Sequence, residues 1–399
     1  MGISLVDCYS KELLMSLKDH YDVAIIGGGP AGSMAAIYLA RFGFDVCLIE
    51  KKKFPRDVLC GEFLSSEVTA LLKELKLFEE FLALNPVLIS RFKSVNESGT
   101  EIHSNLSFPA YALKRSLFDS FLLTEAINSG ANVYQPAEAD FVRREDDKFK
   151  VGIIKQNNKE DILVEVINVI AAYGKQNSFD KKLKRDFITS SSGLNGIKFH
   201  IPNNSIKNYS ADEISIYAAE NIYCGMNTIS ENETTLCALE KRTNGESSPR
   251  KRILKLLESN KNFGDLFNPG IENTLNDLPI YGTGNIYFGR RKIVENHIFM
   301  IGDAAGVIAP IAGDGIGMAF QSAKLISSLL SDFNKGKHSV DQLEKTYVIE
   351  WNKLFLRRIR FALFVQNVVL KRVTNNISYS FSNIFPSIMP ILIRATRSV

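Results

Sequence analysis

Short apolar runs and a helical repeat alternate along the first fifty residues of this chain. VAII (23–26) and DVCLIE (45–50) are typical of buried parallel strands, and SMAAIYLARFG (33–43) between them predicts a helix that ends at Gly43. Another apolar run, IFMI (298–301), predicts a further buried strand late in the chain. This order of elements predicts the fold class α/β, with a Rossmann-like lobe built on a parallel sheet.

The middle of the chain follows a different pattern. EISIYAAE (213–220) and TTLCALE (234–240) alternate apolar and polar residues, as strands with one buried face do. SRFKSVNESGTEIHSNLSF (90–108) predicts two strands around the turn ESGT, and KVGIIKQNNKEDILVEVINVI (150–170) predicts a hairpin. The segments at 90–108, 213–220 and 234–240 predict a second lobe built on a mainly antiparallel β-sheet.

The chain has 399 residues, which is more than one simple domain usually needs. We therefore expect two lobes, of which the Rossmann-like lobe is discontinuous and the antiparallel lobe binds the substrate. The predicted ranges are 20–85, 110–185 and 280–345 for the Rossmann-like lobe, 86–109 and 186–279 for the second lobe, and 346–399 for a C-terminal helical segment.

The last fifty residues predict helices. In EKTYVIEWNKLFLRRIRFALFVQNVVLKR (344–372) apolar residues recur at helical spacing, with Arg357, Arg358 and Arg360 between them. We favour a terminal helix that packs over the second lobe and keeps its charges in water. The alternative is an interfacial surface through which an apolar substrate enters from a membrane or a carrier protein.

Composition and charge exclude several classes of protein. A net charge of +4, without a concentrated basic stripe, argues against nucleic acid as a partner. The five cysteines form no CxxC pair and no metal-spaced His/Asp cluster stands out, so we expect no metal site and a reducing compartment. The chain shows no secretory signal and no run of eighteen apolar residues. We therefore expect a cytoplasmic protein, with peripheral contact to a membrane as the alternative.

A glycine-rich turn joins the first predicted strand to its helix. GGGPAG (27–32) places Gly27, Gly29 and Gly32 in the spacing G-x-G-x-x-G. Gly27 permits the tight turn, Gly29 lets the backbone approach a pyrophosphate, and Gly32 lets helix and strand pack closely. The helix N-terminus offers unpaired N–H groups to phosphates. Glu50 ends the second strand, 23 residues after Gly27, and can accept hydrogen bonds from ribose hydroxyls; the predicted binding set also includes Pro30, Ala31 and Lys51.

A second glycine-rich element favours FAD over NAD as the cofactor. In IFMIGDAAGVIAPIAGDGIGMA (298–319), Asp303 follows the predicted strand and can bond a ribityl hydroxyl. GDGIG then opens a helix whose N-terminus can face the flavin O2 and stabilise the negative charge of a reduced flavin. A plain dehydrogenase does not need such an element ~270 residues after the first, so the sequence predicts FAD. The predicted binding residues here are Gly302, Asp303, Gly313, Gly315, Ile316 and Gly317.

These motifs resemble those of the FAD-dependent oxidoreductases that include p-hydroxybenzoate hydroxylase, geranylgeranyl reductases and flavin-dependent halogenases. The resemblance covers nearly the whole chain and rests on GGGPAGSMAAIYLA, Glu50, FPRDVLCGEFLS, the helix KRSLFDSFLLTEAINSGANV with Arg115 and Asp119, and GDAAGVIAPIAGDGIGMA. It implies that Arg115 helps to hold FAD and that Asp303 bonds the ribityl chain. It also implies that Gly315 to Met318 lie against the pyrimidine end of the flavin.

The same resemblance implies that the loop FPRDVLCGEF (54–63) approaches the isoalloxazine, which makes Cys60 and Glu62 the candidate catalytic residues. The loop precedes the predicted helix SEVTALLKELKLFEEF (66–81), which Ser65 or Ser66 would cap. This helix N-terminus and a nearby cofactor would make the Cys60 thiol more reactive, and some geranylgeranyl reductases carry a cysteine in this loop. Partial burial would raise the pKa of Glu62 and suit it to proton delivery. The alternatives are a small apolar filler for Cys60 and a solvated or structural carboxylate for Glu62. His200 could face the cavity of the second lobe, but a single histidine is more often a bystander.

Three departures from the family bear on the reaction. Hydroxylases carry an Asp-Gly pair where this chain has Tyr173 before glycine, which argues against conventional use of NADPH; we expect either NAD(P)H or a partner reductase as electron source. The motif of tryptophan halogenases is absent, since the one tryptophan is Trp351, and Val307 and Gly313 stand where halogenases carry Phe and Ser. YCGMNT (223–228) keeps only the tyrosine of the Tyr-x-Trp-x-Phe-Pro motif of geranylgeranyl reductases.

The sequence therefore predicts an FAD-dependent oxidoreductase that acts on a hydrophobic small molecule, as enzymes of secondary metabolism do. The leading hypothesis is a monooxygenase that uses a flavin hydroperoxide. The alternatives are a reductase of carbon–carbon double bonds that resembles geranylgeranyl reductase, a flavin-dependent halogenase, and a flavin-stabilised binding protein.

Overall fold

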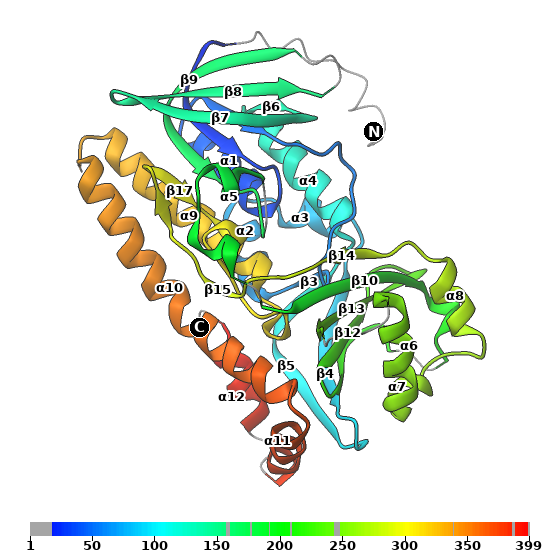
Figure 1. Cartoon of the computed structure of the whole chain (residues 1–399). Coiled ribbons are helices and arrows are strands. Elements are labelled where there is room, and N and C mark those ends of the chain that lie inside the picture. The colour runs from blue at the N-terminus through cyan, green and yellow to red at the C-terminus, as the bar shows by residue number, and fades with distance from the viewer. Residues whose placement is uncertain are drawn as a thin grey trace.

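The computed structural model describes residues 18–156, 160–175, 178–190, 192–207, 210–242, 248–337, 339–384 and 388–397. Within these residues, two β-sheets of eight strands each form the centres of two lobes, and a long helix near the C-terminus runs beside them (Figure 1). The turn of the predicted hairpin at 157–159 lies outside the described residues. The predicted fold class, a Rossmann-like lobe beside a mainly antiparallel second lobe with C-terminal helices, is confirmed.

Parallel strands form the centre of the first sheet. Val23 of the first strand lies opposite Val46, and Ile25 lies opposite Ile170, so that apolar side chains fill the middle of the sheet. The first helix packs against two others, which cover the sheet with it. In spatial order the strands are β17 (Ile298–Met300), β9 (Asp161–Ala171), β1 (His20–Ile26), β2 (Val46–Ile49) and β6 (Asn132–Tyr134), and the helices are α1 (Pro30–Arg41), α4 (Arg115–Asn128) and α9 (Gly315–Asn334).

Smaller elements complete the first lobe. The predicted hairpin is present, because β8 (Lys148–Lys155) pairs antiparallel with β9. The other elements are β7 (Ala137–Glu145), β16 (Val294–Glu295), β15 (Gly289–Arg290), β18 (Gly306–Val307) and α5 (Ser178–Lys182).

The second sheet is antiparallel apart from one parallel pair, β4 with β11. On one face Ile197, Phe199 and Leu236 are buried beneath the outer helices α6 (Pro249–Ser259), α7 (Lys261–Gly264) and α8 (Ile271–Asp277). The other face turns toward the first lobe. The strands, in spatial order, are β14 (Tyr281–Thr283), β10 (Leu194–Pro202), β13 (Glu233–Lys241), β12 (Ile222–Thr228), β11 (Glu213–Ala219), β4 (Val87–Val95), β5 (Glu101–Ala112) and β3 (Phe63–Leu64).

The structure differs from the expectation in two local respects. β3 and β14 add to the second sheet, although their residues fall in ranges assigned to the Rossmann-like lobe. The helix expected after Ser65 is interrupted, because Lys76 takes a left-handed backbone conformation (φ 56°) between α2 (Ser66–Glu74) and α3 (Phe78–Leu82). Ser65 occupies the N-cap position, but its hydroxyl donates to Asp314 instead of capping the helix.

Three helices end the described chain: α10 (Val340–Val369), α11 (Arg372–Ile384) and α12 (Ile388–Ala395). α10 packs along α9 and buries Trp351, so it covers the first lobe over most of its length. Its end reaches the second lobe, where the hydroxyl of Tyr223 donates to Gln366 at 3.1 Å. α11 and α12 continue toward the β4–β5 hairpin (Figure 1). Among the described helices, none is long and apolar enough to cross a bilayer.

The contact between β1 and α1 depends on Gly32. A Cβ added there would overlap the carbonyl oxygen of Gly27, which is backbone and cannot move without opening the turn. We predict that Gly32→Ala lowers the free energy of unfolding by about 3 kcal/mol or more, as severe overpacking does. Urea unfolding of the cofactor-free protein measures the change. Gly315→Ala is the matched control, because a Cβ there meets nothing within 4 Å. Equal stability of the two variants would contradict the packing argument.

Candidate functional site

The predicted phosphate-binding turn lies at the carboxyl end of β1. Gly27 has a φ of 108°, which a residue with a side chain rarely adopts. α1 begins at Pro30 and has no side-chain cap, so its first N–H groups stay available to an anion. A Cβ at Gly29 would meet only the Arg56 guanidinium, at 3.8 Å. This turn offers open backbone beside a positive charge, as a pyrophosphate requires.

Glu50 lies beside this turn. Its carboxylate is buried and accepts hydrogen bonds from the N–H groups of Gly28 and Lys52, each at 2.7 Å. Those bonds fix one carboxylate at the end of β2, where a ribose hydroxyl could reach its remaining lone pairs. The neighbouring Lys51 instead pairs with Glu138 at 2.8 Å in an exposed position.

Sequence reasoning missed Arg56. Its guanidinium donates to Asp119 at 3.1 Å and lies 3.9 Å from Glu50. Arg115 binds the same Asp119 through two nitrogens, at 2.7 and 2.8 Å. Burial disfavours the charged guanidinium, but Asp119 and Cys60 raise the pKa of Arg115, so it stays protonated. Two cations therefore share one buried carboxylate beside the phosphate turn, which leaves positive charge for a pyrophosphate.

The second predicted element comes from the far end of the chain. Gly302 takes φ 56° after β17, and its N–H donates to Ser322 at 3.0 Å. Asp303 follows and pairs with Lys175 at 3.2 Å, a partner that the sequence did not reveal. α9 then begins at Gly315, whose surroundings are open and whose N-cap residue, Asp314, makes no capping hydrogen bond. These groups fit the ribityl chain and the electron-rich end of a flavin.

Asp314 lies fully buried behind this helix start. Arg358 of α10 donates to it at 2.8 Å, Arg397 lies 3.3 Å away, and Ser65 donates at 3.1 Å. Burial raises the pKa of Asp314 to about 6, although the two arginines act in the opposite direction. Because Arg397 also donates to the carbonyl of Gly313 at 3.3 Å, the C-terminal segment is tied directly to the loop that precedes α9.

Tyr173, the departure from the hydroxylases, points into a buried cluster. Its hydroxyl donates to Asp180 at 2.7 Å and accepts from Arg185 at 3.0 Å. Arg185 also donates to the carbonyl of Ala304 at 2.9 Å. Burial raises the pKa of Tyr173, so the hydroxyl stays neutral. This side chain therefore supports the loop after β17, and Lys175 is the residue that faces Asp303.

Glu62 is the most constrained residue of the site. It is fully buried and has a left-handed backbone (φ 59°), which is uncommon for a residue with a side chain. Its carboxylate accepts a hydrogen bond from the Arg115 N–H at 2.8 Å, in the first lobe. From the second lobe it receives Lys198 Nζ at 3.1 Å, His200 Nε2 at 2.7 Å and the hydroxyl of Thr235. One carboxylate thus joins the two lobes.

The expected rise in the pKa of Glu62 is wrong. Burial alone would raise the pKa, but the His200 hydrogen bond, the charge of Lys198 and the N–H of Arg115 outweigh it and lower the pKa to about 2. Burial is complete where the sequence suggested it would be partial, and it comes with donors that stabilise the charged form. Glu62 is therefore an anion at neutral pH and holds no proton to deliver.

Cys60 lies two residues before Glu62. Its Sγ accepts a hydrogen bond from the Glu62 N–H at 3.3 Å, and its thiol is partly buried against the first lobe. Five residues separate it from the start of α2. The roles predicted for Cys60 and Glu62 in catalysis stay predictions.

Asp57, Glu62 and His200 place ligand atoms within 4.8 Å of one another, a grouping that the sequence analysis did not anticipate. Lys198 Nζ already contacts Glu62 and lies over the Tyr281 ring at 5.1 Å. Asp57 accepts from the Tyr281 hydroxyl at 3.1 Å. The ammonium group thus supplies the positive charge that a metal ion would bring, so the donor set fits an ion-paired cluster better than a metal centre.

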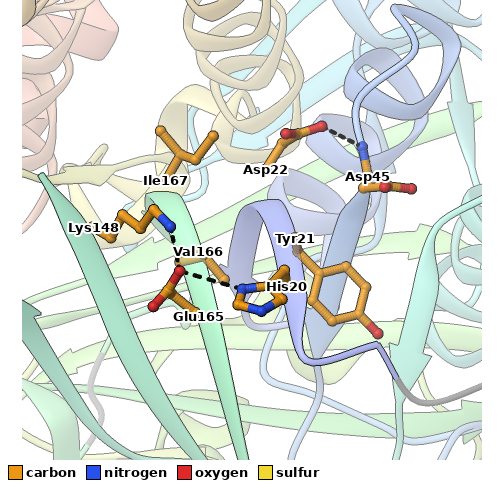
Figure 2. A pocket seen from close by; sticks show the side chains of 8 residues that line it. All are labelled: His20, Tyr21, Asp22, Asp45, Lys148, Glu165, Val166 and Ile167. Atoms are coloured by element: carbon orange, nitrogen blue, oxygen red, sulfur yellow. Dashed lines mark hydrogen bonds and ion pairs between the residues drawn. The ribbon is translucent and has the colours of Figure 1, made fainter.

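A surface pocket at the opposite edge of the sheet is not the cofactor site. Figure 2 shows Glu165 pairing there with both His20 and Lys148, at the amino end of β1. In open parallel sheets, ligands bind outside the carboxyl ends of the strands. Its lining residues are His20, Tyr21, Asp22, Asp45, Lys148, Glu165, Val166 and Ile167.

The structure brings the two predicted glycine elements and Arg115 to one edge of the parallel sheet, but it engages Lys51 elsewhere. Pro30, Ala31 and Ile316 are buried within helix starts and contribute backbone there. Lys198 and Thr235 were not foreseen. Each is a polar residue on the inward face of its strand, which could have marked it as unusual. Its partner, Glu62, lies more than 130 residues away in the sequence, so the pairing could not be predicted.

Comparison with known proteins agrees with this geometry. The profile of the family described as "FAD binding domain" matches residues 20–360. Conditioned medium factor receptor 1 of Dictyostelium discoideum is 26% identical over 349 residues, which are 82% of this chain and 66% of that protein, so the chain spans just under two thirds of its length. Digeranylgeranylglycerophospholipid reductase of Methanosarcina acetivorans is 28% identical over 365 residues, 88% of this chain and 85% of that enzyme.

Solved structures share the fold. A flavoprotein/dehydrogenase from Cytophaga hutchinsonii matches with a TM-score of 0.79 at 20% identity, over 95% of this chain and 93% of that one. A geranylgeranyl bacteriochlorophyll reductase-like protein from Thermoplasma acidophilum gives 0.72 at 22% identity over 90% of each chain. A flavin-dependent brominase gives 0.73 at 18% identity over 94% of this chain and 93% of that one. The chain therefore belongs to the FAD-binding-domain family, and it is an FAD-dependent oxidoreductase.

Proposed function

We propose that this protein is an FAD-dependent reductase that saturates carbon–carbon double bonds in the polyprenyl chain of a lipid. The observation that carries the proposal is the buried pair of Glu62 and His200, on the face of the second sheet that turns toward the cofactor elements. The named activity of the Methanosarcina relative supports it. The substrate class rests on that relative, and the proton chemistry rests on the site.

Saturating a double bond requires one hydride and one proton. Reduced FAD, when bound, would supply the hydride, so the protein must supply the proton. Glu62 lies 2.7 Å from Nε2 of His200 and fixes the orientation of the imidazole ring. Nδ1 is then the ring nitrogen that does not contact Glu62 and can exchange a proton. In this proposal His200 delivers the proton, Glu62 positions it, and Cys60 is the second candidate donor.

The surroundings of this pair suit an apolar substrate. On the same face of the sheet, Ile216 and Leu239 belong to a buried apolar cluster, and Leu59 lies over Gly196 of β10. A few convergent polar groups within an apolar lining are typical of small-molecule sites. Monooxygenation, the leading hypothesis from the sequence, would use the same lining but requires molecular oxygen. Oxygen dependence therefore separates the two reactions.

We predict that the FAD-loaded protein, reduced with dithionite under strict anaerobiosis, adds two hydrogen atoms per double bond to a geranylgeranyl lipid. Mass spectrometry of the extracted lipid measures the product. His200→Gln should slow the reaction about 100-fold, as loss of a proton donor does, without changing FAD content. Cys60→Ala is the parallel variant. A larger loss of rate in Cys60→Ala than in His200→Gln would identify the Cys60 thiol as the proton donor. A product that contains oxygen and forms only in air would overturn the reductase.

The charge state of Glu62 gives a prediction on stability. Its folded-state pKa of about 2 lies below the ordinary value of 4.5, so the carboxylate stabilises the fold above pH 4.5 and loses that contribution as pH falls toward 2. The difference corresponds to about 3 kcal/mol. In Glu62→Gln this dependence should disappear, and the variant should be less stable near neutral pH because Lys198 loses its partner.

Urea unfolding of wild type and variant at about pH 6 and about pH 3 measures this contribution as a difference of differences. Glu80→Gln, at an exposed position on α3, is the matched control. If Glu62→Gln keeps the pH dependence of the wild type, Glu62 is not an anion in the folded state.

Electron supply is part of the proposal, and we expect a partner reductase. Tyr173 is held by Asp180 and Arg185 where hydroxylases carry an acid. We predict that the flavin stays oxidised when NADPH or NADH is added anaerobically and bleaches with dithionite. The visible spectrum measures both steps. Rapid bleaching by either nucleotide would show that the protein takes hydride directly and needs no partner.

A further inference from the structure

We propose that the C-terminal arm, residues 351–397, docks this protein on the surface of an anionic lipid bilayer. This inference goes beyond the proposed function, because it rests on the surface of α10, α11 and α12 and needs no turnover. The arm is the part of the molecule where charge and exposed apolar side chains are both unusual.

α11 is amphipathic, but its polar face is buried and its apolar face is exposed. Its buried face is polar: Asn375 donates to the carbonyl of Val369 at 2.8 Å, and the hydroxyl of Tyr379 bonds Ser94 of β4. Its outward face is apolar, with Val373 at 71% and Ile377 at 64% exposure. A helix that packs on a water-soluble protein normally turns its apolar side inward. The outward stripe is therefore suited to an apolar medium.

The neighbouring helices also carry exposed apolar side chains. Phe364 near the end of α10 and Ile391 of α12 are each 64% exposed, and Phe381 of α11 is half-exposed. Scattered single apolar residues on a surface are ordinary, but three consecutive helices at one end of the chain each contribute here. α11 packs against the end of α10, and both α11 and α12 pack against β5, which keeps these helices together (Figure 1).

The positive charge of the arm favours an anionic lipid surface as the partner. From Trp351 to the end of the sequence there is no Asp or Glu, while the whole chain is nearly balanced at +4. Arg358 and Arg397 form ion pairs with Asp314, and Arg372 lies 3.9 Å from Glu97. Other basic residues of the arm are exposed, among them Arg357, Arg360, Lys371 and Arg394. Basic residues that flank an exposed apolar stripe bind anionic headgroups while the stripe enters the acyl boundary. A second copy of this chain would bring the same positive charge, so like charges would oppose self-association.

The arm contacts both lobes, at the tip of the β4–β5 hairpin and at the loop before α9. Asn96 of the second lobe donates to Asn376 of α11 at 3.1 Å, and Arg397 reaches the carbonyl of Gly313 in the loop before α9.

Sedimentation with vesicles tests the proposal. The FAD-loaded full chain is mixed with vesicles of phosphatidylcholine alone or with phosphatidylglycerol added, and the pelleted protein is measured. We expect binding only with phosphatidylglycerol, weaker at high salt, and at least about tenfold weaker for Val373→Gln/Ile377→Gln, in which Gln keeps the helix propensity. Lys371→Gln/Arg372→Gln should lose much of the salt-sensitive part. Leu163→Thr/Ile167→Thr, at exposed apolar positions on β9, is the matched control and should bind as the wild type does.

Three results would overturn the docking surface. The first is wild-type protein that stays in the supernatant with phosphatidylglycerol vesicles. The second is undiminished binding by Val373→Gln/Ile377→Gln. The third is a wild-type dimer that this variant converts to monomer without any vesicle binding, which would make the stripe a self-association surface. None of these results depends on reductase activity, so failure of the docking surface and failure of the proposed function are distinguishable.

Discussion

The arrangement of the two lobes depends on one buried carboxylate. Glu62 ends the loop that leaves the Rossmann-like lobe, and its two oxygens receive a backbone N–H from that lobe and three side chains from the other. A buried anion is costly unless each of its lone pairs has a donor, and here the donors come from segments that meet only in the folded protein. The left-handed backbone at Glu62 is stable for the same reason, since its surroundings determine it from several sides.

This constraint explains why the glycine-rich elements of the first lobe could be predicted and the surroundings of Glu62 could not. Gly27, Gly29, Gly32 and Glu50 stand within 24 residues, and each has a local reason that strand, turn and helix geometry supplies. The second element, Gly302 to Gly317, has the same local character. The environment of Glu62 is set by residues more than 50 and up to 173 positions away, so burial could be guessed but not the donors that reverse its effect on the pKa.

The same limit applies to Arg56 and to Lys175. Each looks like an ordinary basic loop residue in the sequence, and only the fold brings Arg56 beside Gly29 and Lys175 beside Asp303. Element boundaries were limited in a related way: the helix expected after Ser65 is broken where Lys76 takes a left-handed backbone conformation, between the buried residues Leu75 and Leu77. Sequence patterns therefore predicted the features that depend on residues close together in the chain, and missed the contacts that form only in the folded protein.

A second buried carboxylate, Asp314, shows how the site is closed from the other side. The donors around Glu62 lower its pKa, so it stays charged. Asp314 contacts two arginines, but its pKa is raised because its burial is nearly complete and Glu67 adds negative charge. Removing one partner from such a pair leaves an uncompensated buried charge. Arg397 is therefore expected to stabilise the loop before α9, although it lies near the end of the described chain. The helix start at Gly315 is thus supported by α10 and by the C-terminal residues. If the outward apolar stripe docks on a bilayer, as we propose, the arm that supports this helix start would also hold the protein at the membrane surface.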